Sequence, residues 1–177
     1  MRTTSGYSCN IMSYILRLAI IVTVWCFVPG ISIKAVQGPK HFDLASFYNT
    51  ISRNDLSELN AALQELKESS FNDKDAYEGA LLMKKAGLLS KAKEKLSTFK
   101  SGRQKLEAAI SREPGNAEFR FLRLIIQENA PKIVKYKSSI NEDGMMVRTL
   151  FKKLPPVVQQ AIRDYSKKSK TLAPSDF

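Results

Sequence analysis

The sequence predicts an all-α fold, either a small helical bundle or an array of helical hairpins. Three observations lead to this prediction. Apolar residues recur every three or four positions along the chain beyond residue 40, which is the spacing of one helix face. Short breakers containing Pro, Gly or Asn separate these periodic segments. Beyond the first 35 residues, no stretch shows the sustained alternation or β-branched runs that are typical of strands.

The chain divides into a predicted signal peptide over 1–35, a helical domain over 36–170 and a flexible tail over 171–177. The first 35 residues contain three basic residues and no acid, and their apolar stretch LAIIVTVWCFV spans 18–28. A basic start, a short apolar run and a small residue at the cleavage site are typical of a secretory signal peptide. The alternative is a membrane anchor formed by residues 15–33. The protein is therefore expected to be exported, either periplasmic or secreted.

Three helices are predicted in the first half of the domain. The first covers about 43–52, and Asn54 is expected to cap the second. A third helix follows a cap at Asn72 and ends near Gly87, because Asn favours helix starts and Gly favours helix ends. The apolar stripe of the second helix consists of Leu56, Leu59, Leu63 and Leu66.

The longest helix is predicted from Ser90 to Arg112. Gly102 falls on its apolar face, where the missing side chain would admit a close neighbour. Pro114-Gly115-Asn116 is expected to end this helix and cap the next one. The apolar positions are Leu96, Phe99, Leu106, Ala109 and Ile110.

Three more helices complete the predicted domain. Residues 117–130 form the most apolar of them, and Pro131 closes it. Ser139 is expected to cap a helix that continues to about Lys153. Pro156 suits the first turn of a final helix, because proline lacks the amide hydrogen that has no partner there.

The region 91–130 resembles the junction between two tetratricopeptide repeats. Leu106, Ala109 and Pro114 occupy the offsets of a large residue, a small residue and the terminal proline of that family, and the phrase EPGNA at 113–117 is typical of the junction. The resemblance implies consecutive antiparallel helix pairs that curve around a groove. A plain orthogonal bundle is the alternative, because no second copy occurs at the period of about 34 residues.

The net charge of +11 is unevenly distributed along the chain. Residues 36–80 contain 4 basic and 8 acidic residues, whereas residues 81–177 contain 21 basic and 9 acidic residues. A basic surface of this kind should attract anions. The candidate partners are an acidic protein, an anionic lipid and a cell-wall polymer, whereas export disfavours nucleic acid.

The residue inventory predicts neither a metal site nor a cofactor. The single histidine is His41, and both cysteines, Cys9 and Cys26, lie in the predicted signal peptide. Zinc sites and nucleophilic triads need more of these residues than the mature chain contains. We therefore expect no catalytic residues. The remote alternative is a carboxylate-based hydrolase that would use Glu128 and Glu142 with Asp143 across a cleft.

A narrow polar stripe marks the candidate partner site on the helix after Pro114. Its first four residues lie within about 60° of one another on the helix, and the fifth extends its polar end. The stripe either faces solvent or binds a partner, since paired guanidinium groups hold a carboxylate or phosphate by bidentate hydrogen bonds. The stripe consists of Asn116, Arg120, Arg123, Gln127 and Glu128.

A second candidate surface is a basic ridge on the longest helix. It is either a solvated face or a cationic surface for an anionic partner. Its residues are Lys91, Lys93, Lys95, Lys100, Arg103 and Lys105.

Together these features predict a non-enzymatic exported protein that acts as a protein-interaction or scaffold module. The main alternative is a membrane-tethered envelope protein whose basic face lies toward anionic lipid or polymer. Cleavage of a wall polymer by carboxylates is the remote third possibility.

Overall fold

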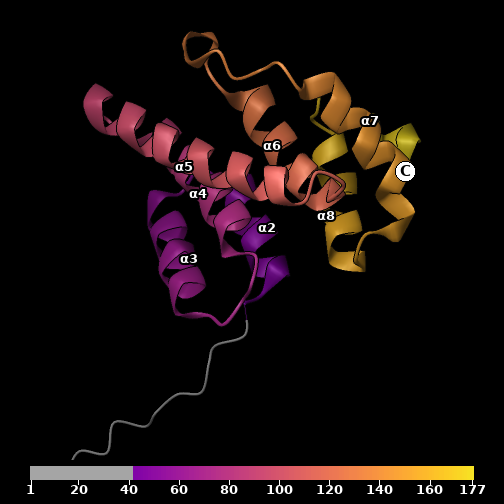
Figure 1. Ribbon diagram of the computed structural model, residues 1–177, viewed down its shortest axis with the longest axis horizontal. Helices are drawn as coiled ribbons and strands as arrows, with labels where there is room; N and C mark the ends of the chain where they lie inside the picture. The colour runs from indigo at the N-terminus through magenta and orange to yellow at the C-terminus, as the bar shows by residue number, and fades with distance from the viewer. Residues whose placement is uncertain (1–41) are drawn as a thin grey trace, which may run out of the picture. The chain divides into compact units, whose positions relative to one another are not determined.

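The computed structural model describes residues 42–177, and these residues form seven α-helices and three 3₁₀ turns without a strand (Figure 1). The all-α prediction is confirmed. The predicted signal peptide over 1–35, the alternative anchor over 15–33 and His41 lie outside the described residues. Residues 42–177 belong to one compact unit. Within the described part of the chain, no helix has the length and apolar character needed to cross a membrane.

The first half of the domain consists of α2 (Leu44–Ser52), α3 (Leu56–Glu68) and α4 (Lys74–Leu88). Asp43 caps α2, because its carboxylate accepts hydrogen bonds from first-turn amides at 3.0 and 3.3 Å. Asp55 caps α3 in the same way at 2.7 and 3.0 Å, so the predicted cap Asn54 is one residue too early. Asp73 precedes α4 in place of the predicted Asn72. Asp suits the position before a helix better than the predicted Asn, because its negative charge also interacts favourably with the positive end of the helix.

Helix α5 (Ala92–Arg112) packs along α4 as a close hairpin. Gly102 lies against Gly79, and each glycine touches the backbone of the other helix. A Cβ atom added at Gly102 would lie 2.6 Å from the Gly79 carbonyl oxygen, and one added at Gly79 would lie 2.7 Å from the Gly102 oxygen. The prediction that Gly102 admits a close neighbour is confirmed.

The second half of the domain consists of α6 (Ala117–Asn129), α7 (Ile140–Leu150) and α8 (Pro156–Ser166), with the 3₁₀ turns η1 (Lys132–Val134), η2 (Phe151–Lys153) and η3 (Pro174–Asp176). Asn116 caps α6 as predicted, because its side-chain oxygen accepts from two first-turn amides at 3.0 and 3.2 Å. Pro156 begins α8, also as predicted. Helix α6 packs along α7 and also contacts α4.

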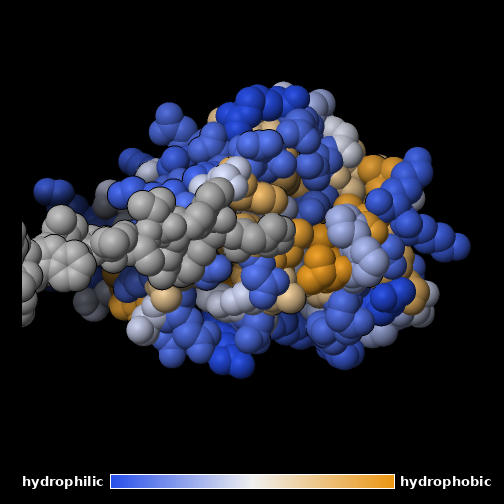
Figure 2. All heavy atoms as spheres, turned by 90° about the horizontal axis from the view of Figure 1, so that it is seen from below, coloured by the Kyte–Doolittle hydropathy of each residue, from blue (hydrophilic) through white to orange (hydrophobic). Residues whose placement is uncertain are grey.

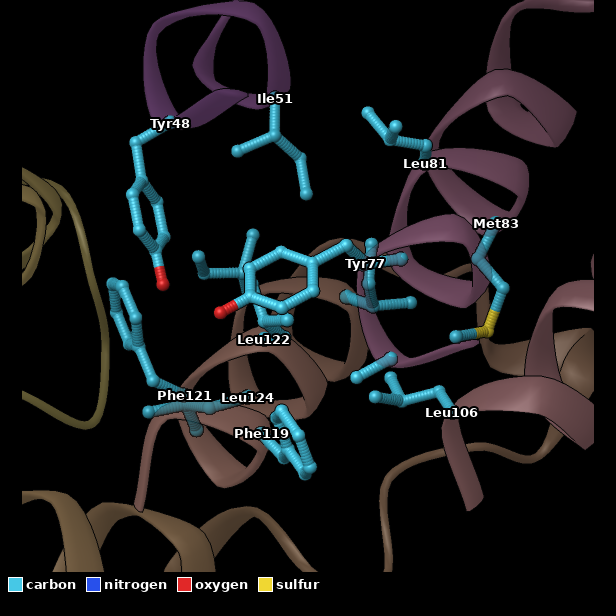
Figure 3. Close-up of a cluster of buried hydrophobic side chains, with 14 of the residues drawn as sticks. Tyr48, Ile51, Tyr77, Leu81, Met83, Leu106, Phe119, Phe121, Leu122 and Leu124 are labelled. Atoms are coloured by element: carbon cyan, nitrogen blue, oxygen red, sulfur yellow. The ribbon is translucent and has the colours of Figure 1, made fainter. Parts of the chain in front are cut away.

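Helix α6 is the centre of the core. Its residues 117–127 are all buried, which is expected of a helix that is enclosed on every side. Aromatic rings surround it: the Tyr48 and Phe121 centroids lie 5.9 Å apart, and those of Tyr77 and Phe119 lie 6.3 Å apart. Figure 3 shows these four rings gathered with the aliphatic side chains of the core.

The same core contains a carboxylate. The Tyr48 hydroxyl donates a 2.7 Å hydrogen bond to Oε1 of Glu118, which is 9% exposed. Burial raises the pKa of Glu118 above its ordinary value, and the hydroxyls of Tyr48 and Tyr77 offset only part of that rise. In Figure 3 both hydroxyls point into the same part of the core. The carboxylate therefore joins α2, α4 and α6 and makes their packing sensitive to pH.

Leu96 is the exception among the predicted core residues of the longest helix. It is 50% exposed, whereas Phe99 is 8% exposed and Leu106 is fully buried. Figure 1 shows the reason, because the first half of α5 extends beyond the helices that cover its second half. The apolar periodicity continues past the point at which the packing ends.

The predicted flexible tail over 171–177 is wrong. Leu172 is 2% exposed, and the ring of Phe177 stacks on that of Phe151 at 4.6 Å between centroids. Chain ends are ordered when they dock on the body of a domain. Here Glu128 provides the docking point, as described below.

Candidate binding groove

The predicted partner stripe on α6 is buried instead of exposed. Arg120 is 8% exposed, Arg123 is 5% exposed and Gln127 is 1% exposed. Arg123 forms a bidentate pair with Asp143 of α7, in which Nε and Nη2 each donate at 2.7 Å. The guanidinium group thus holds a carboxylate, as its chemistry predicts, but that carboxylate belongs to the same chain. Neither the solvent-facing interpretation nor the partner-site interpretation describes these arginines.

The ion pairs extend to the helices on both sides of α6. Arg120 reaches Asp143 and the exposed Glu142, each at 3.2 Å. Arg123 Nη1 lies 2.9 Å from Glu107 of α5. Burial alone lowers the pKa of Arg123, but Asp143 and Glu107 raise it well above the ordinary value. The network therefore favours the charged form of Arg123 and fastens α6 to α5 and α7.

The two amides of the stripe also have internal positions. Asn116 caps α6 and donates to the Glu113 carboxylate at 3.0 Å. Gln127 is enclosed, and its Oε1 atom has no hydrogen-bond partner among the described residues. Neither side chain is presented to a partner.

Glu128 holds the C-terminal segment in place. Its carboxylate accepts hydrogen bonds from the Tyr165 hydroxyl at 2.6 Å, from Ser169 Oγ at 2.9 Å and from the Lys170 amide at 3.0 Å. Burial alone raises the pKa of Glu128, but these donors lower it below its ordinary value. A general acid needs a raised pKa, so this environment suits a fixed anion. Within residues 42–177, no three His, Cys, Asp or Glu residues form a group that could hold a metal ion.

A groove of about 660 Å³ lies between α2, α6 and α8. Each helix contributes one face, because its lining residues are spaced by three and four positions. Figure 2 shows the side of the molecule where α2 and α8 lie, with apolar surface enclosed by hydrophilic residues. The lining residues are Ala45, Tyr48, Asn49, Ile51 and Ser52 on α2; Phe121, Ile125, Glu128 and Asn129 on α6; and Val157, Gln160, Ala161, Asp164 and Tyr165 on α8.

The floor of the groove is apolar and its rim carries amides. Phe121 and Ile125 form the floor and are buried, and the half-buried Ala161 forms part of the wall. The side chains of Asn49 and Asn54 lie exposed at the rim. An amide side chain both donates and accepts hydrogen bonds. This combination can bury an apolar side chain while pairing the polar backbone that carries it.

The charged rim has an excess of lysines. Lys84 of α4, Lys168 and Lys170 line the groove, and none of them forms an ion pair with a described residue. The two acids at the groove are already occupied, since Glu128 accepts the hydrogen bonds above and Asp164 pairs with Lys167 at 2.7 Å. Burial, and then the neighbouring charge of Lys168, lower the pKa of Lys84. An anion placed beside Lys84 and Lys168 would raise the pKa of Lys84 again by attraction, and so oppose both effects.

The residues of the predicted basic ridge on α5 differ in their contacts. Lys105 pairs with Glu78 at 3.2 Å and Asp75 at 3.5 Å, so it serves the α4–α5 contact. The guanidinium group of Arg103 lies 4.9 Å from the centre of the Tyr136 ring. Lys91 is exposed and pairs with the neighbouring Glu94. The three other members are exposed and form no ion pair with a described residue: Lys93, Lys95 and Lys100.

Comparisons of this chain with protein families, with curated protein sequences and with solved structures find no significant match.

Proposed function

We propose that the protein is an exported, non-enzymatic helical module that binds an extended, acidic segment of a partner protein in the groove between α2, α6 and α8. The observation that carries this proposal is the set of three groove lysines that form no ion pair with a described residue, beside an apolar floor. The sequence pattern of the first 35 residues supports export. The mature protein would begin near residue 36.

The chemistry of the groove supports an extended peptide as the ligand. An extended chain leaves its amides and carbonyls unpaired, and the rim amides Asn49 and Asn54 offer partners for both. The buried floor accepts an apolar side chain, and the volume lies within the usual range of ligand clefts. Lys84 and Lys168 favour Asp or Glu beside that side chain, and they disfavour a basic peptide by charge repulsion.

The arrangement of the helices is compatible with the same role. Helices α4 and α5 pack as one consecutive pair, and α6 and α7 pack as the next. We propose that these pairs form a short array of helical hairpins, as the resemblance to tetratricopeptide repeats implies. Stacked helix pairs provide elongated surfaces for partner proteins.

Selection from a random library of 12-residue peptides tests the proposal. The bait is the chain from residue 36, which contains all the described residues, 42–177. Selected peptides should contain an apolar residue flanked by Asp or Glu. Lys84→Gln should weaken their binding about fivefold, which corresponds to about 1 kcal/mol for one partly exposed charge pair. The matched control Lys100→Gln removes an exposed lysine of α5 and should leave the affinity unchanged.

A second pair of variants tests the location of binding. Ala161→Arg places a large side chain in the groove and should abolish binding of the selected peptides. Ala108→Arg makes the same change at an exposed position of α5 and should have no effect. Enrichment of basic peptides, or equal affinity of the Ala161 and Ala108 variants, would overturn the proposal.

A further inference from the structure

A surface separate from the groove is formed by the loop after α6 and the first half of α5. Ile133, in the turn η1 after α6, is 88% exposed, and Leu96 on α5 is 50% exposed. The ring of Tyr136 packs edge-on against Phe99 at 5.7 Å between centroids and lies next to Arg103. These contacts hold the loop over 131–137 beside the first half of α5, above which it rises in Figure 1. We call the loop and this half of α5 the basic tip.

The outward position of Ile133 is built into the loop. Val134, the next residue, packs against the core, and Tyr136 is 3% exposed. The loop is thus anchored directly after Ile133, which is the most exposed large hydrophobic residue of the described chain. The Lys135 amide donates a 3.1 Å hydrogen bond to the Lys132 carbonyl oxygen, which closes the turn. Ile133 therefore remains directed toward solvent when the loop keeps its packing.

The charge around Ile133 and Leu96 is predominantly positive, and the acid in this half of α5, Glu94, pairs with Lys91. The loop 131–137 contains three lysines and no acid. Of the exposed lysines in the basic tip, only Lys91 has an ion-pair partner among the described residues, at 3.2 Å from Glu94. The others are Lys93, Lys95, Lys100, Lys132, Lys135 and Lys137.

We propose that the basic tip contacts an anionic membrane surface, with Ile133 and Leu96 entering the interfacial region and the lysines lying at the headgroups. Long lysine side chains can keep their charge at the headgroups while their stems lie along apolar surface. Single aliphatic residues surrounded by lysines fit this boundary, where apolar burial and attraction to anionic lipid act together.

Other anionic partners fit the basic tip less well. A single-stranded nucleic acid needs exposed aromatic rings on which bases stack, but Phe99 and Tyr136 are both buried. The energy of a protein–protein contact concentrates on residues that enter well-packed pockets. Ile133 is instead a single exposed apolar residue in a projecting turn.

Vesicle co-sedimentation tests this proposal with the chain from residue 36, so that the apolar stretch at 18–28 cannot contribute. Cooperative thermal unfolding first confirms that each variant is folded. The protein should bind vesicles of phosphatidylcholine and phosphatidylserine at 3:1 and should not bind phosphatidylcholine alone. Binding should fall as salt rises, because salt screens exposed charges.

Two matched pairs of variants locate the contact. Lys132→Glu with Lys137→Glu should lower the partition coefficient by at least tenfold, since each lysine near the surface contributes roughly fivefold. Lys152→Glu with Lys153→Glu makes the same change in net charge at exposed positions of η2 and should lower it far less. Ile133→Ser should lower it several-fold, and Met145→Ser, at a residue that is 60% exposed on α7, should not.

The outcomes separate lipid contact from general attraction to anions. Equal losses for the two charge pairs would show a net-charge effect and overturn the proposal. An Ile133→Ser variant that binds like the wild type, or equally strong binding to soluble polyglutamate, would also overturn it. Peptide binding in the groove should be unchanged in all four variants, so this test is independent of the proposed function.

Discussion

Replacement of Gly102 by alanine should strongly destabilise the domain. The added Cβ would lie 2.6 Å from the Gly79 carbonyl oxygen and 2.9 Å from both Leu82 Cβ and Met83 Cγ. The nearest of these atoms belongs to backbone, so a change of rotamer cannot relieve the contact and α4 and α5 must separate. Overpacking of this kind costs about 1–3 kcal/mol, and a backbone clash belongs at the upper end of that range.

The opposing effect of helix propensity is smaller. Alanine stabilises a helix interior by roughly 0.5–1 kcal/mol relative to glycine. The expected net loss is therefore about 2 kcal/mol in the free energy of unfolding. For a domain of this size, that loss should lower the Tm by roughly 6–10 °C.

Gly87→Ala is the matched control. Gly87 lies in α4, but a Cβ atom there would meet nothing within 4 Å, and its φ is not positive. This variant should gain up to about 0.5–1 kcal/mol from helix propensity alone. Urea unfolding followed by circular dichroism should thus give shifts of opposite sign for the two variants. A Gly102→Ala protein that is as stable as the wild type would refute the close crossing of α4 and α5.

Three further variants test the buried charges. Asp143→Asn should lower the free energy of unfolding by about 3–5 kcal/mol, because it leaves Arg120 and Arg123 buried without their shared carboxylate. The control Glu142→Gln, at an exposed partner, should lower it by at most about 1 kcal/mol. Equal losses for the two variants in urea unfolding would contradict this prediction. Glu118 has a raised pKa when folded, so the stability that its protonated form contributes is present at low pH and is lost as pH rises through that pKa. Glu118→Gln should therefore gain stability relative to the wild type between pH 4 and pH 8, and a difference that does not vary with pH would exclude a buried ionisable carboxyl. Glu128 has a lowered pKa, so the stability that its charged form contributes is lost as pH falls through that value. Glu128→Ala should speed amide hydrogen exchange in residues 169–177 at neutral pH. Unchanged exchange would show that this segment docks without Glu128.

The fold was largely predictable because local signals agree with the packing. The sequence identifies residues 117–130 as the most apolar helix of the domain, and α6 lies at the centre of the core. Asn116, Pro156 and Gly102 each act through local geometry, as a cap, a helix start and a close approach. These roles depend on a few neighbouring residues, which the sequence displays directly.

The candidate site was not predictable in the same way. The periodicity of α6 identifies Arg120 and Arg123 as a polar stripe, but a polar stripe faces either water or a buried counter-charge. Their partner Asp143 is twenty-three residues from Arg120 and twenty from Arg123, and it belongs to another helix, so only the fold can decide between the two. The groove was missed for a similar reason, since its walls come from the two ends of the domain, α2 and α8.

The tail shows a further limit of local reasoning. Residues 171–177 follow a basic segment at the chain end, a position that predicts fraying. Their docking depends on Glu128, an acid more than forty residues earlier in the chain, and on an aromatic contact with Phe151. Contacts between residues this far apart in the sequence leave no local pattern from which they could be predicted.

Mapping a bound peptide by NMR tests the central claim most directly. An acidic peptide from the library selection should be titrated into the isotopically labelled chain from residue 36, and changes in amide shifts should be recorded along the sequence. If the peptide binds in the groove, the largest changes should cluster on the facing sides of α2, α6 and α8, including Asn49 and Ala161. These changes should disappear in Ala161→Arg. Saturable shifts confined to the basic tip, with the groove undisturbed, would contradict the claim.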